Sequence, residues 1–207
     1  MDEKQFLFLD FEFTMPQNRK KPKGFFPEII EVGLVSVVGC TMEDTYSSYV
    51  RPESFPNLTN RCKNFLGIAQ EAVDGGISFL ALVDKLVQYE ERYKPTIVTW
   101  GNMDMKVLKH NCEVAGVPFP FSGVCRDLSL EYKRFFGERN QTGLWKAIEA
   151  YGKAGTGKHH CALDDAMTTY NIFKLVEKDK EYLVKPAPPT LGELVDFSKL
   201  VKKVSTQ

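Results

Sequence analysis

Two acidic residues interrupt an apolar segment near the start of the chain, and their spacing would suit metal chemistry. In "FLFLDFEFT" (6–14), Asp10 and Glu12 are surrounded by the Phe and Leu residues of a buried strand. In a strand, residues i and i+2 project from the same face, about 6.5 Å apart. Two buried carboxylates repel each other unless a cation lies between them, and hard divalent cations take carboxylate oxygens as ligands. The alternative for this motif alone is an edge strand with a solvated acidic face.

A third acid, Asp104, follows a predicted strand in "TWGNMDMKVL". Gly101 favours a turn after that strand, and Asn102 can cap the next helix, so that Asp104 lies in the first helical turn. An acid in this position complements the helix dipole and needs no further function. Ligands also gather where the strands of such sheets end. Both interpretations stay open for this residue.

Histidine and aspartate residues combine in "HHCALDDAMTTYNIF" (159–173). The segment opens a predicted helix whose apolar stripe would pack against the sheet. Asp165 lies nearer to this stripe than Asp164 does. His160 precedes the helix in a loop, where an imidazole that titrates near neutral pH can face the same site. An exposed histidine followed by two acids at a helix N-terminus explains this motif equally well when it is taken alone.

Together, the three motifs resemble the DEDDh family of 3′–5′ exonucleases, in the order D-x-E, D and H-x-x-x-x-D. The stretches "EDTYSSYVRPE", "LTNRCKNFLGIAQEAVD", "TWGNMDM" and "HHCALDDA" are similar to the subgroup that contains the animal histone-mRNA and RNA-interference exonucleases. The resemblance runs from about residue 5 to residue 178. The stretches "DFEFTMPQ" and "GFFPEIIEVG" resemble a bacillar member described as an inhibitor of sporulation, which implies a role in sporulation as well.

This resemblance implies an α/β fold of the ribonuclease-H-like type, in which a mixed five-stranded sheet is flanked by helices. It implies that two Mg²⁺ or Mn²⁺ ions are held by Asp10, Glu12, Asp104 and Asp165. Asp10 would bridge the ions, Glu12 and Asp165 would complete one shell, and Asp104 would support the other. His160 would be the general base, a role that contributes about 10²–10⁴-fold. The implied enzyme is a phosphodiester hydrolase that releases 5′-mononucleotides from the 3′ end of single-stranded RNA, with DNA as the alternative substrate.

Four more residues are predicted to bind substrate, again from the resemblance. Phe13 and Thr14 would meet the terminal nucleotide, and Leu66 and Met103 would flank its base. An apolar residue near a sheet edge more often belongs to the core, and this alternative stays open. The animal relatives carry Trp in place of Met103 and Ala in place of Phe13, which predicts weaker stacking on the base and a narrower pocket.

Three other interpretations compete with the exonuclease. The segment "GKAGTGKH" (152–159) nearly fits a phosphate-binding loop, but His159 replaces the hydroxyl residue and a helix precedes the segment where a strand is required. We interpret its glycines as making the loop that carries His160 mobile. A regulatory protein that binds a partner without catalysis is the second alternative, although none of the predicted site residues is missing. A DNA-directed proofreading nuclease is the third, because 2′-hydroxyl contacts cannot be deduced from one sequence.

The charge balance restricts how nucleic acid can be held. Lys+Arg and Asp+Glu each number 27, which predicts no general affinity for polyanions. Contact must then come from bound cations or from a local basic patch. The candidate patch is the loop 15–27, which would guide the backbone of a single strand or simply be solvated. Its basic residues are Arg19, Lys20, Lys21 and Lys23.

Cysteine usage and the apolar segments bear on the compartment. The five cysteines include no C-x-x-C pair, which argues against a disulfide framework or a zinc site. Asp2 and Glu3 stand where a signal peptide has basic residues, and no apolar stretch reaches the length of a membrane helix. We therefore expect a cytoplasmic protein that contacts no membrane.

Hydrophobic periodicity predicts strands first and then alternating strands and helices, which indicates a mixed sheet flanked by helices. The predicted elements are strands 5–13, 28–38 and 45–52, helix 79–93, strand 96–100, helix 103–116, a short strand near Val124, and helices around 128–136, 143–151 and 163–177. We expect one exonuclease domain over 1–180, followed by a Pro-rich spacer and a small terminal helix over 181–207. That helix would pack on its own domain or dock on a protein partner that the sequence does not identify.

Overall fold

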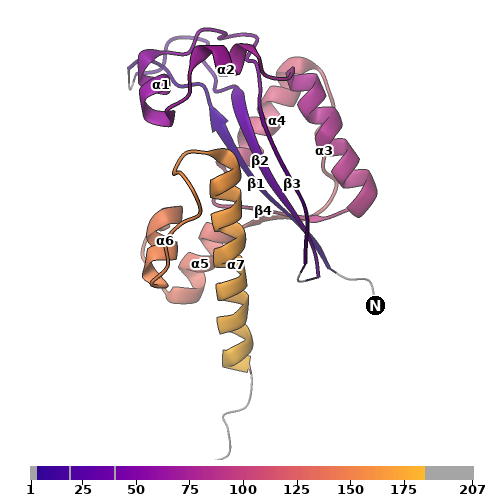
Figure 1. The fold of residues 1–207 in the computed structure, drawn as a ribbon, viewed down its shortest axis with the longest axis vertical. Coiled ribbons are helices and arrows are strands. Elements are labelled where there is room, and N and C mark those ends of the chain that lie inside the picture. Colours follow the sequence, from indigo (N-terminus) through magenta and orange to yellow (C-terminus); the bar gives the residue numbers. More distant parts are fainter. Residues whose placement is uncertain (1–3, 19, 40, 185–207) are drawn as a thin grey trace, which may run out of the picture. The chain divides into compact units, whose positions relative to one another are not determined.

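The computed structural model describes residues 4–18, 20–39 and 41–184 (Figure 1). The elements in chain order are β1 (Gln5–Phe13), β2 (Ile29–Val38), β3 (Thr41–Tyr49), α1 (Asn60–Leu66), α2 (Gln70–Asp74), α3 (Phe79–Tyr93), β4 (Thr96–Thr99), α4 (Met103–Ala115), β5 (Cys125–Asp127), α5 (Leu128–Phe136), α6 (Leu144–Ala150) and α7 (Ala162–Val184). The chain forms two compact units, of which the first is Met1–Lys174 and the second starts at Leu175. All of the predicted site residues belong to the first unit.

Five strands form one sheet in the order β3-β2-β1-β4-β5. The first three strands are an antiparallel meander, whereas β4 runs parallel to β1 and β5 runs parallel to β4. This arrangement confirms the mixed five-stranded sheet flanked by helices that the order of elements predicts. It also places β1, the strand that carries the D-x-E motif, in the middle of the sheet.

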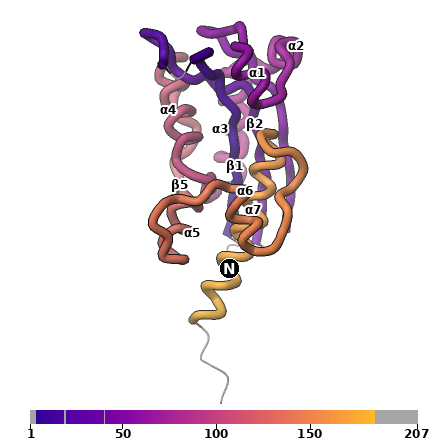
Figure 2. The backbone as a smooth tube through the Cα atoms, turned by 90° about the vertical axis from the view of Figure 1, so that its left-hand side faces the viewer, coloured from indigo at the N-terminus to yellow at the C-terminus, as the bar shows by residue number. Residues whose placement is uncertain are grey.

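Alternation along β1 divides its side chains between two faces of the sheet. Leu7, Leu9 and Phe11 belong to the main core, which α3 and α4 cover. Phe8 points to the other face, where its ring lies 5.0 Å from that of Tyr170 in α7. The views in Figures 1 and 2 agree that α3 and α4 lie on one side of the sheet and α7 on the other. Even-numbered residues further along β1 therefore face the start of α7.

The helix ends follow the local signals in the sequence. The side chain of Ser78 caps α3 by accepting a hydrogen bond from Ala81 N, and α4 ends at Gly116 in the left-handed conformation. Asn102 occupies the N-cap position of α4, but its side chain makes no capping hydrogen bond. Helix α4 begins at Met103, directly after Asn102, which places Asp104 in its first turn.

Several element boundaries differ from the prediction. The third strand is Thr41–Tyr49, whereas the sequence predicts 45–52, because the chain leaves the meander before Pro52 and Val50 instead pairs with Ile77. The helices α1 and α2 were not predicted, because their seven and five residues are too few to show a helical period. Helix α7 continues to Val184, past the predicted end at 177.

The predicted division of the chain at residue 180 falls inside α7. The Pro-rich spacer and the terminal helix predicted within 185–207 lie outside the described residues. The division therefore stays a prediction.

Within the described ranges, no helix combines the length and the apolar character that a membrane crossing requires. The cysteines described by the structure are free thiols, namely Cys62, Cys112, Cys125 and Cys161.

Gly33 allows the start of α7 to lie directly against the sheet. A Cβ atom on Gly33 would lie 2.0 Å from the carbonyl carbon of Ala162 and 2.1 Å from the nitrogen of Leu163. We expect Gly33→Ala to lower the midpoint of thermal unfolding by several degrees, because overpacking costs about 1–3 kcal/mol and each kcal/mol shifts the midpoint by roughly 2–4 °C at this size. Gly143→Ala is the control, since its Cβ would meet no atom within 4 Å. Equal midpoints for the two variants would contradict the close approach.

Candidate active site

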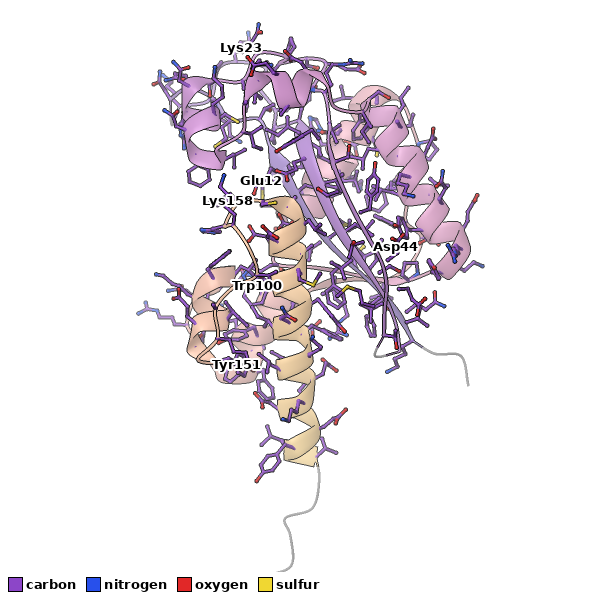
Figure 3. The ribbon with its side chains drawn as sticks, viewed as in Figure 1. Glu12, Lys23, Asp44, Trp100, Tyr151 and Lys158 are labelled. Carbon is purple, nitrogen blue, oxygen red and sulfur yellow. The ribbon has the colours of Figure 1, made fainter. Side chains whose placement is uncertain are left out.

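Asp10 and Glu12 lie on β1 beyond the segment that pairs with β4, which ends at Phe8. Both project from the face of Phe8, toward the start of α7, as the D-x-E spacing predicts. On the antiparallel side, Asp10 is opposite Gly33 and Glu12 is opposite Glu31. Glu12 is buried, with 7% of the residue exposed, and Figure 3 shows it near the first turn of α7. The edge strand with a solvated acidic face is therefore excluded.

Asp104 reaches β1 from helix α4. It is buried in the first turn of α4, and its Oδ1 accepts a hydrogen bond of 3.1 Å from the backbone nitrogen of Phe11. Phe11 stands between Asp10 and Glu12 in the strand. The side chain therefore does more than complement the helix dipole, because it joins α4 to the strand that carries the other two acids.

Asp165, in the first turn of α7, is held through both of its oxygens. Oδ1 accepts a hydrogen bond of 2.7 Å from Nε1 of Trp145, and Oδ2 accepts one of 3.2 Å from the backbone nitrogen of His160. Asp164, its neighbour, instead accepts from the backbone nitrogen of Lys158 at 2.7 Å. As predicted, Asp165 is the more buried of the two and is the one that faces the sheet.

The acids from β1 and α7 converge. One carboxylate oxygen from each of Asp10, Glu12 and Asp165 lies within 4.8 Å of the other two. Asp104 is outside this closest group, yet its charge is the largest of the neighbouring charges that raise the pKa of Asp10. The fold therefore brings together four carboxylates, of which the first and the last are more than a hundred residues apart in the sequence.

His160 stands beside this cluster. Its backbone is left-handed, with φ at 63°, and its Nδ1 lies 3.6 Å from Oε1 of Glu12. The imidazole ring lies between two other rings, with centroids 3.9 Å from His159 and 4.3 Å from Phe65. Burial, and then the neighbouring His159, lower the pKa of His160 below its ordinary value of 6.5. The imidazole is therefore largely neutral at pH 7 and able to accept a proton.

The acid cluster has no cationic partner in the described part of the chain. Burial, followed by the charges of the other acids, raises the pKa of Asp10 well above its ordinary range and that of Glu12 to about 8. Burial likewise raises the pKa of Asp104 to about 7 and that of Asp165 above its ordinary value. No Lys or Arg among the described residues forms an ion pair with these four carboxylates. Because buried carboxylates are unfavourable without a counter-ion, this donor set fits hard divalent cations.

Comparisons with known proteins identify the family. The sequence profile of the exonuclease family RNase_T matches residues 7–173. The chain is also 56% identical over 205 residues to probable 3′–5′ exonuclease KapD of Bacillus subtilis (strain 168), covering 99% of this chain and 100% of that protein. The chain belongs to this exonuclease family.

Two further relatives refine the assignment. The nuclease domain of 3′hExo, a DEDDh family member bound to rAMP, matches the exonuclease with a TM-score of 0.76 at 29% identity, over 86% of this chain and 93% of that chain. Human 3′–5′ exoribonuclease 1 is 32% identical over 175 residues, which are 79% of this chain and 50% of the human protein, so the exonuclease spans about half of its length. These matches confirm the DEDDh assignment and the ribonuclease-H-like fold. Membership of this family also implies a requirement for divalent metal ions.

The acid cluster predicts how the stability of the metal-free exonuclease varies with pH. The pKa of Glu12 rises from 4.5 to about 8 on folding, so the folded state binds more protons than the unfolded state between these values. Stability is therefore expected to fall as the pH rises from about 5 to about 8. Thermal unfolding in a chelator tests this, and Glu12→Gln should give a flatter dependence than the parent chain. A midpoint that is constant or rises over this range would contradict the result.

Glu31 is a further buried acid next to this cluster, and the sequence analysis did not single it out. Its Oε1 accepts a hydrogen bond of 3.3 Å from the backbone nitrogen of Ala162 and contacts the sulfur of Cys161 at 3.6 Å. It therefore holds the N-terminus of α7 against β2. The signal was present, because "EIIEVGLVSVV" also sets an acid into an apolar strand, and the register places Glu31 opposite Glu12.

Two of the four predicted substrate residues, Leu66 and Thr14, are buried. Leu66 is 1% exposed and belongs to a core cluster with Ile30 and Cys62. Thr14 is buried, and its Oγ1 accepts a hydrogen bond of 2.9 Å from the backbone nitrogen of Glu28. The structure therefore accounts for Leu66 and Thr14 as positions that hold the fold. The exposed apolar residue of α1 is Phe65, which directly precedes Leu66.

Two exposed apolar side chains lie close to residues of the site in space or in sequence, namely Phe65 and Met103. Phe65 is 53% exposed and lies against the ring of His160. The sequence analysis did not single out this residue. Met103 is 54% exposed at the start of α4, one residue before Asp104. Phe13 is partly buried and packs against the main core. Of the four predicted substrate residues, Met103 is therefore the one whose apolar side chain is exposed.

The loop between α6 and α7 is not a phosphate-binding loop. A helix, α6, precedes it where that motif requires a strand, which confirms the prediction. The loop is also tied to α7, because Thr156 N donates to Thr168 Oγ1 at 2.8 Å and Lys158 N donates to Asp164. These hydrogen bonds hold the loop against α7, and His160 lies beside the acids. The mobility of the loop, predicted from its glycines, stays a prediction.

The basic cluster lies in the exposed loop between β1 and β2. Lys20, Lys21 and Lys23 are exposed, and Arg19 lies outside the described residues. Figure 3 labels Lys23 at the same end of the molecule as α1 and α2, above Glu12 in that view. No described acid forms an ion pair with these lysines, and their contact with a nucleic acid backbone stays a prediction.

Proposed function

We propose that this exonuclease hydrolyses single-stranded nucleic acid, with RNA favoured, from its 3′ end and releases 5′-mononucleotides. The observation that carries the proposal is the convergence of the carboxylates of Asp10, Glu12 and Asp165 next to Nδ1 of His160. The site combines buried acids that require divalent cations with a neutral imidazole within reach of them. Phosphodiester hydrolysis needs both, since a proton must leave the attacking water and charge develops on the leaving oxygen.

Four side chains are proposed to hold two Mg²⁺ or Mn²⁺ ions: Asp10, Glu12, Asp104 and Asp165. When bound, such ions would activate water and neutralise the charge on the leaving oxygen. The chain's own contribution is to hold the carboxylates in place before substrate arrives. Asp104 is fixed to β1 through Phe11, and Asp165 accepts hydrogen bonds on both oxygens.

His160 is proposed as the general base. Its ring stacks on His159 and contacts the tilted ring of Phe65, and its lowered pKa keeps it neutral at physiological pH. A neutral imidazole accepts the proton of the attacking water and releases it to solvent, because its side chain is 28% exposed.

Phe65 and Met103 are proposed to contact the terminal base, with Phe65 taking the place that the sequence analysis gave to Leu66. Both are exposed apolar side chains, and each neighbours a residue of the proposed machinery, His160 and Asp104 respectively. Aromatic and apolar side chains bind bases by stacking and van der Waals contact without requiring a particular sequence. The similar nuclease domain of 3′hExo is bound to rAMP, and the human relative is named an exoribonuclease, which supports RNA as the substrate.

Matched oligomers test the proposal. Purified protein in Mn²⁺ or Mg²⁺ is incubated with RNA and DNA strands of the same sequence, each with a free or a blocked 3′ end. We expect 5′-labelled RNA to shorten progressively to a ladder, the blocked strand to persist, and a chelator to stop the reaction. DNA should be shortened more slowly than RNA.

Other outcomes would contradict the proposal. Shortening of the strand with the blocked 3′ end would exclude a 3′–5′ direction, and faster hydrolysis of DNA would exclude the RNA preference. Binding of the oligomer without shortening in either metal would instead favour the regulatory alternative. A role in sporulation, which the sequence resemblance implies, stays a prediction.

A further inference from the structure

Trp145 connects α6 to one of the proposed metal-binding acids. Its indole Nε1 donates a hydrogen bond of 2.7 Å to Oδ1 of Asp165, twenty residues further along the chain. A charged acceptor and this short distance make it one of the stronger types of hydrogen bond. The contact joins two helices that the sequence separates by the loop carrying His160.

The indole ring has little freedom to move. A Cβ atom on Gly155 would lie 2.7 Å from the ring of Trp145, so that the loop backbone approaches the ring as closely as only glycine permits. The ring of His159 lies 5.0 Å away on the same loop. Helix α6 holds the backbone of Trp145 in place, because two of its other residues, Leu144 and Ile148, are buried. The donor is therefore held in one position relative to Asp165.

The N–H of an indole can be satisfied without a carboxylate. The other tryptophan of the chain, Trp100, donates its Nε1 to the backbone carbonyl of Thr142 at 3.0 Å. Trp145 instead uses a carboxylate of the acid cluster, whose second oxygen is already held by the backbone of His160. Each oxygen of Asp165 is thus oriented by a separate segment, one by α6 and one by the loop.

We propose that Trp145 is a positioning residue of this exonuclease, which orients the Asp165 carboxylate and thereby sets the affinity of the site for divalent cations. The inference rests on the proposed function, in which Asp165 binds a metal ion. Hydrogen bonds to ligating carboxylates fix their direction, and losing one typically weakens metal affinity or activity by about 10–100-fold. The indole also lets α6, which carries none of the proposed ligands, contribute to the geometry of the site.

The test compares two substitutions of the same type. Trp145→Phe removes the donor to Asp165 and keeps an aromatic ring, whereas Trp100→Phe removes a donor to a backbone carbonyl. Both purified, metal-free variants are titrated with MnCl₂ in a calorimeter. We expect Trp145→Phe to bind Mn²⁺ about 10–100-fold more weakly than the parent chain, and Trp100→Phe to bind it with unchanged affinity.

A second readout separates positioning from general damage to the fold. At saturating Mn²⁺, Trp145→Phe should recover most of the parental kcat, so that the effect appears in the concentration of metal needed for half-maximal rate. Unchanged Mn²⁺ affinity in Trp145→Phe, or an equal loss in Trp100→Phe, would overturn the proposal.

A third variant covers the case in which Trp145→Phe fails to fold. Gly155→Ala keeps the tryptophan but places a Cβ against its ring, which should displace the indole from Asp165 and weaken Mn²⁺ binding in the same direction. Gly143→Ala, where a Cβ meets no atom within 4 Å, is its control and should leave binding unchanged. Parental affinity in Gly155→Ala would count against the proposal.

Asp165→Asn distinguishes the failure of this inference from the failure of the proposed function. If Asp165→Asn binds Mn²⁺ as the parent chain does, the assignment of Asp165 as a ligand is wrong and the proposal for Trp145 is wrong with it. If Asp165→Asn loses Mn²⁺ binding while Trp145→Phe keeps it, only the positioning role is wrong.

Discussion

Asp10→Asn is expected to abolish hydrolysis and to stabilise the metal-free protein at the same time. The carboxylate is surrounded by Glu12, Asp104 and Asp165, and burial raises its pKa well above the ordinary range. An amide has nearly the same shape and carries no charge, so it removes this repulsion. It is also a poor ligand for a divalent cation, and the several kcal/mol that metal ions contribute to such reactions correspond to a rate loss of about a thousandfold or more.

Two measurements check this prediction. The rate of oligomer shortening is compared with the midpoint of thermal unfolding in a chelator at about pH 8, where the acids of the parent cluster carry more charge than at lower pH. We expect the rate to fall below detection and the midpoint to rise by a few degrees. Asp84→Asn is the matched control, because Asp84 is exposed on α3, and it should change neither property. A lower midpoint in Asp10→Asn would show that the parent carboxylate is not repelled by its neighbours.

His160→Ala is expected to lower kcat by about 10²–10⁴-fold, the usual contribution of a general base. The imidazole lies 3.6 Å from Glu12 but is not among the four proposed metal ligands. Affinity for Mn²⁺ should therefore change far less than the rate. Substrate binding should weaken only modestly, since Phe65 keeps its exposed face.

Steady-state kinetics and a calorimetric Mn²⁺ titration separate the two effects. His110→Ala serves as the control, because His110 is an exposed residue on α4 that pairs with Glu113 and not with the site. A variant at His160 that turned over at the parental rate while losing Mn²⁺ would assign the imidazole to the metal and not to proton transfer.

The positions of the acids could be predicted from the sequence because each depends on local geometry. The two-residue period of a strand places Asp10 and Glu12 on one face, and the turn at Gly101 places Asp104 in the first turn of a helix. The apolar stripe of α7 identifies Asp165 as the inward acid. Convergence of these residues in space was implied by the family resemblance and not by any of these local patterns.

The contacts that support the acids depend on tertiary packing and could not be predicted. The bond between Trp145 and Asp165 requires knowing where α6 lies relative to α7. The burial of Leu66 and the exposure of Phe65 depend on which side of the short helix α1 packs on the sheet, and seven residues give too short a pattern to decide this. The position of Glu31 opposite Glu12 follows from strand register, which a sequence leaves open by one or two residues.

Anomalous scattering from a crystal soaked in manganese shows whether the four carboxylates bind metal. We expect two manganese peaks among the carboxylates of Asp10, Glu12, Asp104 and Asp165, with the imidazole of His160 adjacent and not bound to either. A map with no manganese at these carboxylates, although the side chains are ordered and the crystal is active when dissolved, would contradict this expectation.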